Sequence, residues 1–236
     1  MAEQDNPLEI RIDTRVVRQL GAELITDPEQ ALLELIKNAY DADADRCRVE
    51  IDTRTEAQFF DGIRAKDNTD SVDVIAKQVE VLGGQITVQD DGPGVTLQDI
   101  YERWLLISGS EKRPDAGHKK YTTKKGRTPL GDKGIGRLGT MRLGDCVQFI
   151  SRPKGSAESA NGVEFRWSKF DSAPTLDKVP VQEAEDKPHK GFSTRVMIEG
   201  LYEPEHWLTE DQSELQARIS RLGSKLINFA AARRQS

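Results

Sequence analysis

Cysteine and histidine are scarce in this chain, and neither is spaced for chemistry. The two cysteines, Cys47 and Cys146, lie far apart in segments that alternate like strands, so we expect two core residues rather than a disulfide framework or a zinc knuckle. The three histidines are scattered without the spacing of metal ligands. The sequence therefore argues against a disulfide-rich scaffold and against a histidine-based metal site.

Long apolar runs are also missing. No stretch approaches the roughly 18 consecutive apolar residues of a membrane helix, and the polar start MAEQDNPLEIRID lacks the basic-then-apolar order of a secretory signal. A chain of 236 residues with 36% hydrophobic residues can still bury a sizeable core. We expect one globular domain over residues 1–236, cytoplasmic and with no membrane partner.

Positive charge is in deficit, except in one segment. The formal net charge of −6 argues against a chain that coats nucleic acid over its whole surface. Between residues 108 and 137, however, nine basic residues stand against three acidic ones, a local net charge of +6. A basic, glycine-rich island in an acidic protein indicates an anionic ligand nearby, and DNA remains one of the alternatives.

Hydrophobic periodicity predicts one α/β domain without internal repeats. The expected helices are residues 14–24, 28–44, 74–82, 96–107 and a terminal helix within 205–236. The expected strands are residues 8–12, 46–52, 84–90, 147–153, 163–170 and 193–199. Residues 53–73 are expected to be a polar insertion, and residues 172–190 a loose surface excursion.

The segment ELIKNAYDADA places polar residues along one helix face. Asp27, Pro28 and Gln30 predict the start of this helix as a capping box. Helical spacing then puts Glu34, Asn38, Asp41 and Asp45 within roughly 40° of one another, beside the apolar stripe. Such a face suits a hydrated divalent cation and an aligned water, although a solvated face is the alternative. The aspartates also mimic a calcium loop, but Arg46 replaces its turn glycine, which argues against calcium.

Two glycine-containing turns follow. In VQDDGPGV a strand delivers Asp90 to a turn in which Gly92 and Gly94 let a flat ring approach the backbone. In GDKGIGRLG the letters GIGRLG match the dinucleotide fingerprint, but no strand precedes them and no acid ends a following strand. The P-loop pattern is absent as well. A phosphate-binding loop or a plain turn remains.

Together, ELIKNAYDA, DDGPG and GDKGIGRLG resemble the three motifs of the GHKL ATPases, over about residues 13–198. The resemblance implies a Bergerat ATP-binding fold: a two-layer α/β (α+β) sandwich with a mixed, mostly antiparallel sheet covered by helices on one face. It makes Glu34 the general base and Asn38 the magnesium ligand, and it gives Asp90 the recognition of adenine. The further nucleotide contacts it implies are Asp41, Ala42, Gly92, Gly94, Val95, Ser108, Lys112, Gly131, Asp132, Lys133, Gly134, Ile135, Gly136, Arg137 and Thr194.

Within this superfamily the chain looks most like the MORC-like and heat-shock-chaperone-like branch. The resemblance implies ATP and Mg²⁺ as ligands, slow hydrolysis, an ATP lid at residues 108–130 and an ATP-dependent homodimer. It also implies that the helix within 205–236 leads to an absent transducer domain or partner subunit that would supply a γ-phosphate-sensing residue. The alternative is an interaction module that binds ATP or ADP with little hydrolysis, and a DNA-contacting lid stays open.

Overall fold

The computed structural model describes residues 12–25, 27–60, 63–64, 79–106, 122–130, 136–156, 159–186, 190–208 and 217. They contain a seven-stranded sheet in the order β2-β1-β3-β7-β4-β5-β6, in which each neighbouring pair is antiparallel. The strands are β1 Cys47–Phe60, β2 Ile63–Arg64, β3 Val79–Asp90, β4 Gly144–Ser151, β5 Asn161–Arg166, β6 Val181–Glu185 and β7 Thr194–Leu201. The described part of the sheet is therefore antiparallel throughout, where the sequence left a mixed sheet open.

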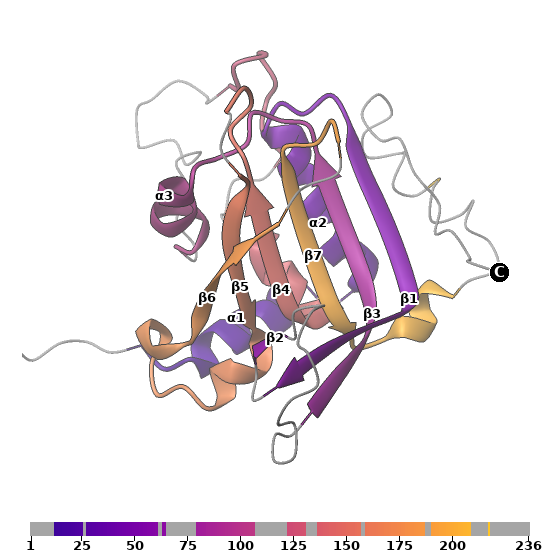
Figure 1. The fold of residues 1–236 in the computed structure, drawn as a ribbon, viewed down its shortest axis with the longest axis vertical. Helices are drawn as coiled ribbons and strands as arrows, with labels where there is room; N and C mark the ends of the chain where they lie inside the picture. Colours follow the sequence, from indigo (N-terminus) through magenta and orange to yellow (C-terminus); the bar gives the residue numbers. More distant parts are fainter. Residues whose placement is uncertain are drawn as a thin grey trace, which may run out of the picture.

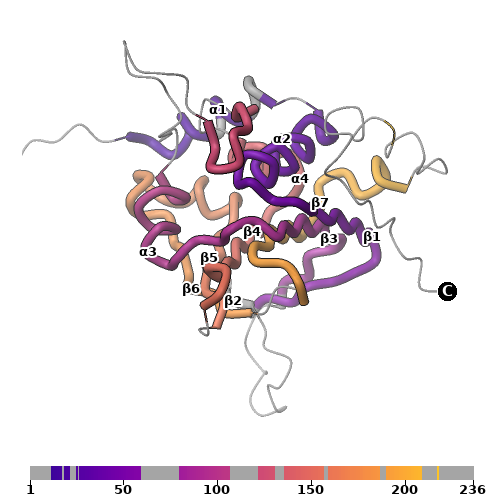
Figure 2. The backbone as a smooth tube through the Cα atoms, turned by 90° about the horizontal axis from the view of Figure 1, so that it is seen from above, coloured from indigo at the N-terminus to yellow at the C-terminus, as the bar shows by residue number. Residues whose placement is uncertain are grey.

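Helices cover one face of this sheet, as Figures 1 and 2 show for α1, α2 and α4. The α-helices are α1 Arg15–Leu24, α2 Pro28–Asp41, α3 Leu97–Asp99 and α4 Thr140–Leu143. A π-helical turn, Ile100–Trp104, continues α3, and 3₁₀ turns span Gly136–Gly139, Trp167–Asp171, Leu176–Lys178 and Pro204–Trp207. The two-layer α/β sandwich expected from the sequence is confirmed.

Helix α2 begins where the sequence predicts. Asp27 caps it, because its Oδ1 accepts from the backbone N–H groups of Glu29 at 2.7 Å and Gln30 at 3.1 Å. Pro28 occupies the first turn, where its missing N–H costs nothing. The side-chain amide of Gln30, expected to complete a capping box, instead donates to Glu34 at 3.3 Å. The cap therefore depends on Asp27 alone.

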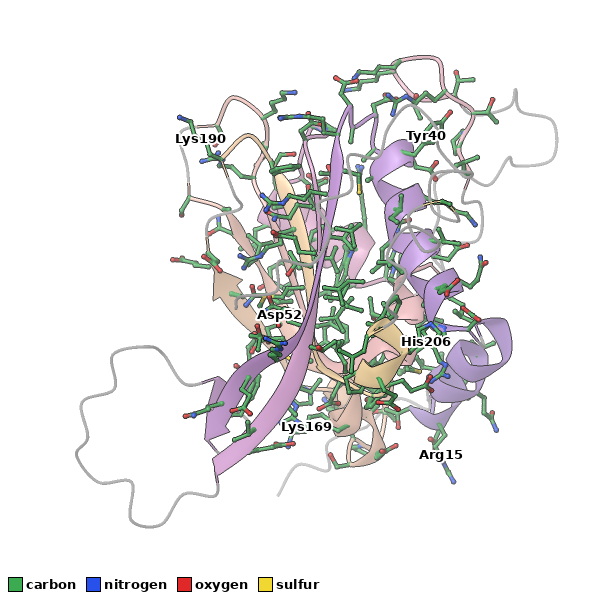
Figure 3. The ribbon with its side chains drawn as sticks, turned by 90° about the vertical axis from the view of Figure 1, so that its right-hand side faces the viewer. Arg15, Tyr40, Asp52, Lys169, Lys190 and His206 are labelled. Atoms are coloured by element: carbon green, nitrogen blue, oxygen red, sulfur yellow. The ribbon has the colours of Figure 1, made fainter. Side chains whose placement is uncertain are left out.

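The main core lies between α2 and the sheet, where side chains fill the space between the two layers (Figure 3). Its centre from α2 is fully buried and includes Ala31 and Leu32, and the strands contribute Ile86 and Ile198, each also 0% exposed. Burying one such aliphatic side chain contributes about 1.5–3 kcal/mol. Since this stripe faces the sheet, the polar residues beside it are left at the edge of the helix.

Three expectations about the sheet were wrong. Residues 53–60 continue β1 past an irregularity between Asp52 and Glu56, and residues 79–82, expected in a helix, belong to β3. The expected surface excursion at 172–190 contains β6, which pairs with β5. In each case cross-strand partners distant in sequence outweigh a weak local pattern.

Candidate functional site

Glu34 and Asn38 lie one turn apart on α2, and the third motif lies beside them. A Cβ placed on Gly136 would be 3.5 Å from Glu34 Oε2 and 3.6 Å from both polar atoms of the Asn38 side chain. Glu34 Oε1 accepts from Lys37 Nζ at 2.7 Å, and 23% of the Glu34 side chain is exposed. The structure thus brings the end of GDKGIG against the two residues expected to carry hydrolysis.

Asp90 lies at the end of β3, directly opposite Thr194 on β7. Thr194 Oγ1 is 3.0 Å from Ser151 Oγ, the last residue of β4. The backbone N–H of Ser193 donates to Asp90 O at 2.8 Å, which fixes the two strand ends together. The Asp90–Thr194 neighbourhood that the family resemblance implies is therefore present in the sheet register.

The carboxyl group of Asp90 has an unusual environment. Burial is the main cause that raises the pKa of this carboxyl to about 7, and Asp91 acts in the same direction. The N–H of Gly92, 2.9 Å from Asp90 Oδ1, acts in the opposite direction. A strand end that keeps a carboxyl desolvated favours the neutral form unless a donor arrives. Perturbed carboxyls of this kind gather at functional sites.

The glycines of the second motif permit close packing. A Cβ on Gly92 would lie 2.8 Å from Asp90 Oδ1 and 2.9 Å from the carbonyl oxygen of Ala42, just past the end of α2. Gly94 has φ +67°, and a Cβ there would lie 2.0 Å from the carbonyl oxygen of Arg152. Val95 N donates to Ser151 Oγ at 3.0 Å. The second motif therefore packs against the end of the first.

The four polar residues expected on one helix face do not share a role. Helix α2 ends at Asp41, so Asp45 lies beyond it. Asp41 is buried and its Oδ1 accepts from Leu130 N at 2.8 Å, whereas Asp45 pairs with Lys125 at 2.5 Å. Within the described ranges, no three His, Cys, Asp or Glu side chains form a group that could hold a metal ion. The expectation that Asp45 shares the helix face was therefore wrong.

Arg137 is engaged away from α2. Its Nη1 donates to the carbonyl oxygens of Arg103 at 2.8 Å and Leu106 at 3.1 Å, and also to that of Trp104. Burial lowers the pKa of this guanidinium to about 10, and its Cζ lies 5.9 Å from the Trp104 ring centroid. Arg137 thus supplies hydrogen-bond donors at the end of the π-helical turn.

Several expected site residues lie outside the described residues. They are Ser108, Lys112, Gly131, Asp132, Lys133, Gly134 and Ile135. The same holds for residues 108–121 of the expected lid and for most of the expected terminal helix, of which the structure describes 205–208 and 217.

Two contributions were missed from the sequence. Asp91, placed at a variable position of the second motif, accepts from Arg46 Nε at 2.9 Å and from the N–H groups of Asp45 and Arg46 at 2.8 and 2.7 Å. Ser151 joins Val95 to Thr194. No local signal marks either residue, because both act through strand pairings distant in sequence.

Comparison with known proteins agrees with this geometry. No curated protein matches the chain. None of the helices in the described ranges has the length and apolar character needed to cross a membrane. The family described as histidine kinase-, DNA gyrase B-, and HSP90-like ATPase matches residues 25–194, which include α2, the DDGPG turn and GDKGIGRLG. The chain belongs to this ATPase family.

Proposed function

We propose that the protein binds ATP with Mg²⁺ and hydrolyses it slowly, and that the nucleotide state acts as a conformational switch. The observation that carries this proposal is the position of Gly136, where an added Cβ would lie 3.5 to 3.6 Å from Glu34 and Asn38. Because phosphoryl transfer depends mainly on positioning and charge stabilisation, a glycine loop beside a carboxylate and an amide is the arrangement that the reaction needs.

Adenine recognition is assigned to Asp90. Its carboxylate would accept a hydrogen bond from the exocyclic amine, and Thr194 and Ser151 would orient the polar groups around it. Gly92 leaves the Asp90 carboxyl uncovered, because a Cβ there would lie 2.8 Å from Asp90 Oδ1, whereas Gly94 makes room for the Arg152 carbonyl. Since the pKa of Asp90 is raised to about 7, a donor that favours the ionised form gains affinity as the pH rises through this value.

Glu34 is assigned as the general base. Its Oε1 is paired with Lys37, while its Oε2 is on the side of Gly136, where an attacking water would be held. Asn38 fits a magnesium ion because its exposed side chain offers a hard oxygen donor beside Gly136. Bound there, magnesium would neutralise phosphate charge.

The switch is assigned to lid closure and N-terminal dimerisation. Val16 and Leu20, one turn apart on α1, are 43% and 39% exposed, and Ile12, which precedes the helix, is 52% exposed. A second copy could cover these apolar side chains. By the family resemblance, Ser108, Lys112 and the sequence Gly131–Ile135 would contact phosphates, and a partner or transducer domain would complete the γ-phosphate site. We also propose that the chain belongs to the MORC-like or heat-shock-chaperone-like branch of the family.

A second candidate is an interaction module that binds ATP or ADP and barely hydrolyses it. The Glu34–Lys37 ion pair favours it, because a lysine at 2.7 Å competes with water for the carboxylate. Salt-dependent DNA binding that persists without nucleotide would instead support the DNA alternative.

The decisive experiment is calorimetry with MgATP on the parent, followed by phosphate release in the same samples. We expect binding and slow release in the parent. Glu34→Ala should keep binding but lower release by about 10² to 10⁴-fold, the contribution of a general base. Glu29→Ala, in the first turn of the same helix, is the matched control and should release phosphate like the parent. Equal release by Glu34→Ala and the parent would refute the assignment.

A further inference from the structure

Residues 122–130 are attached to the carboxyl end of α2 by three aspartates, Asp41, Asp43 and Asp45. Asp43 Oδ1 accepts from Thr123 Oγ1 at 2.5 Å, and Asp43 Oδ2 accepts from Lys125 N at 3.0 Å. Lys125 Nζ donates to Asp45 at 2.5 Å. Thr123 is buried, and the Asp43 side chain is 13% exposed, so this contact is largely shielded from water.

Arg127 is the centre of this attachment. Its Nη1 donates to the carbonyl oxygens of Tyr40 at 3.2 Å and Ala44 at 2.8 Å, and its guanidinium lies 4.9 Å from the Tyr40 ring centroid. Only 16% of the side chain is exposed. The last carbonyls of a helix lack partners within it, and a cation there is favoured by the helix dipole. Figure 3 labels Tyr40 at this end of α2.

The backbone of Asp43 is strained at the same place. Its φ is +58°, and it is the only non-glycine residue with positive φ in the described part of the chain. Aspartate and asparagine tolerate this left-handed conformation better than most residues, but it still costs free energy. The carboxylate of this residue makes the contacts with Thr123 and Lys125 from this left-handed backbone conformation.

The attached segment, residues 122–130, directly precedes the glycine-rich motif GDKGIGRLG in the sequence. Leu130, at the end of the attached segment, donates its N–H to Asp41 on α2 at 2.8 Å. A Cβ on Gly136, the first described residue after 131–135, would lie 3.5 Å from Glu34 and 3.6 Å from Asn38 on the same helix. Both residues that flank 131–135 are therefore held by α2, one at its end and the other near its middle.

We infer that Arg127 is a positioning residue for the nucleotide site, which acts by holding residues 122–130 against the carboxyl end of α2, the helix that carries Glu34 and Asn38. This inference rests on the proposed function of the site. Arg127 touches neither Glu34 nor Asn38 in the described contacts. Asp41, Asp43 and Asp45 thus hold residues 122–130 in place. Lys125 and Arg127, two of the basic residues between 108 and 137, pair with carboxylates of the protein itself.

The first test measures MgATP affinity by calorimetry on the parent, Arg127→Ala and Arg127→Lys. Arg127→Ala loses the contacts with the Tyr40 and Ala44 carbonyls and the ion pairs with Asp43 at 3.8 Å and Asp45 at 3.6 Å. MgATP affinity should therefore weaken roughly tenfold in Arg127→Ala, and less in Arg127→Lys, which keeps the charge. Lys124→Ala removes the same charge from an exposed position in the same turn and should bind like the parent. An equal loss in Lys124→Ala would show a general charge effect and overturn the inference.

The second test does not depend on nucleotide. Hydrogen exchange of the Leu130 amide should be faster in Arg127→Ala, whereas the Gly92 amide, bonded to Asp90, should exchange as in the parent. A purely structural loss would speed both amides and overturn the inference. Asp43→Asn, which tolerates the left-handed backbone, repeats the test if Arg127→Ala unfolds, and it should also speed Leu130 alone.

The outcomes separate the two claims. A parent that binds MgATP while Arg127→Ala binds equally well would overturn the inference and leave the proposed function standing. A folded parent that binds no MgATP would overturn the proposed function, and the positioning role with it. Weakened MgATP binding with faster exchange at Leu130 alone would support both.

Discussion

Replacing Asp90 by asparagine should make the nucleotide-free protein more stable at high pH. The side chain keeps its shape and an oxygen that can accept from Gly92 N, 2.9 Å away in the parent, but it loses the charge. Burial raises the pKa of the Asp90 carboxyl from 3.8 to about 7, so ionising this group costs the folded state free energy. A residue kept at such a cost is expected to serve a ligand.

The sign and size follow from this shift. Between about pH 4 and pH 7 the folded protein holds a proton that the unfolded chain has released, so the free energy of unfolding falls as the pH rises through this window. At about 1.4 kcal/mol per pKa unit, a shift of roughly three units sets an upper bound near 4 kcal/mol. We expect Asp90→Asn to exceed the parent by about 2–4 kcal/mol at pH 8 and to equal it at pH 4.

Urea unfolding at pH 4, 6 and 8 tests this, with Asp52→Asn as the control. Asp52 is exposed and its pKa is lowered, chiefly by the Arg54 N–H. The stability of Asp52→Asn relative to the parent should therefore fall as the pH rises, whereas that of Asp90→Asn should increase. With MgATP at about 100 times Kd, the parent should gain about 2.7 kcal/mol and Asp90→Asn much less. A stability difference between Asp90→Asn and the parent that does not change from pH 4 to pH 8 would refute the reasoning.

Three further predictions test the structure around the site. Gly94→Ala should destabilise the protein by about 2 kcal/mol or more, because φ is +67° and the new Cβ would meet the Arg152 carbonyl at 2.0 Å; wild-type thermal stability would contradict this. Asp145→Ala should cost about 1–3 kcal/mol in urea unfolding, since the buried Arg166 loses one of its two carboxylate partners, Asp145 at 2.8 Å, and keeps only Glu80. Both cysteines should resist a thiol reagent until the protein unfolds, because both are buried and burial raises the pKa of the Cys47 thiol; rapid labelling of the native protein would count against their core positions.

Local patterns predicted the main helix and most strands. The cap at Asp27, the proline at 28 and the stripe through Leu32 and Leu35 specify α2 because a helix repeats its buried face every 3.6 residues. Sequence patterns failed where they are weak and strand pairing determines the structure. Residues 56–60 of β1 pair with residues 79–83 of β3, and neither segment was predicted as a strand.

The candidate site shows the same division. Glu34, Asn38, Asp90 and Gly136 could be found because each lies in a motif with characteristic spacing. Their neighbours could not be found in this way. Thr194 lies opposite Asp90 only because of the β3–β7 register. Asp41 accepts a hydrogen bond from Leu130 N, which is 89 residues later in the chain. Arg137 was expected near phosphate, but its donors lie at the end of the π-helical turn.

The sequence alone determined the fold class, the family and the three motifs, since these depend on periodicity and on residue types close together in the chain. Only the tertiary structure decided which aspartates remain available to a ligand and which hold the chain itself, as Asp43 holds Thr123 and Lys125. The physical reason is that a carboxylate takes its role from the donors around it, and in this protein those donors come from segments far away in the sequence.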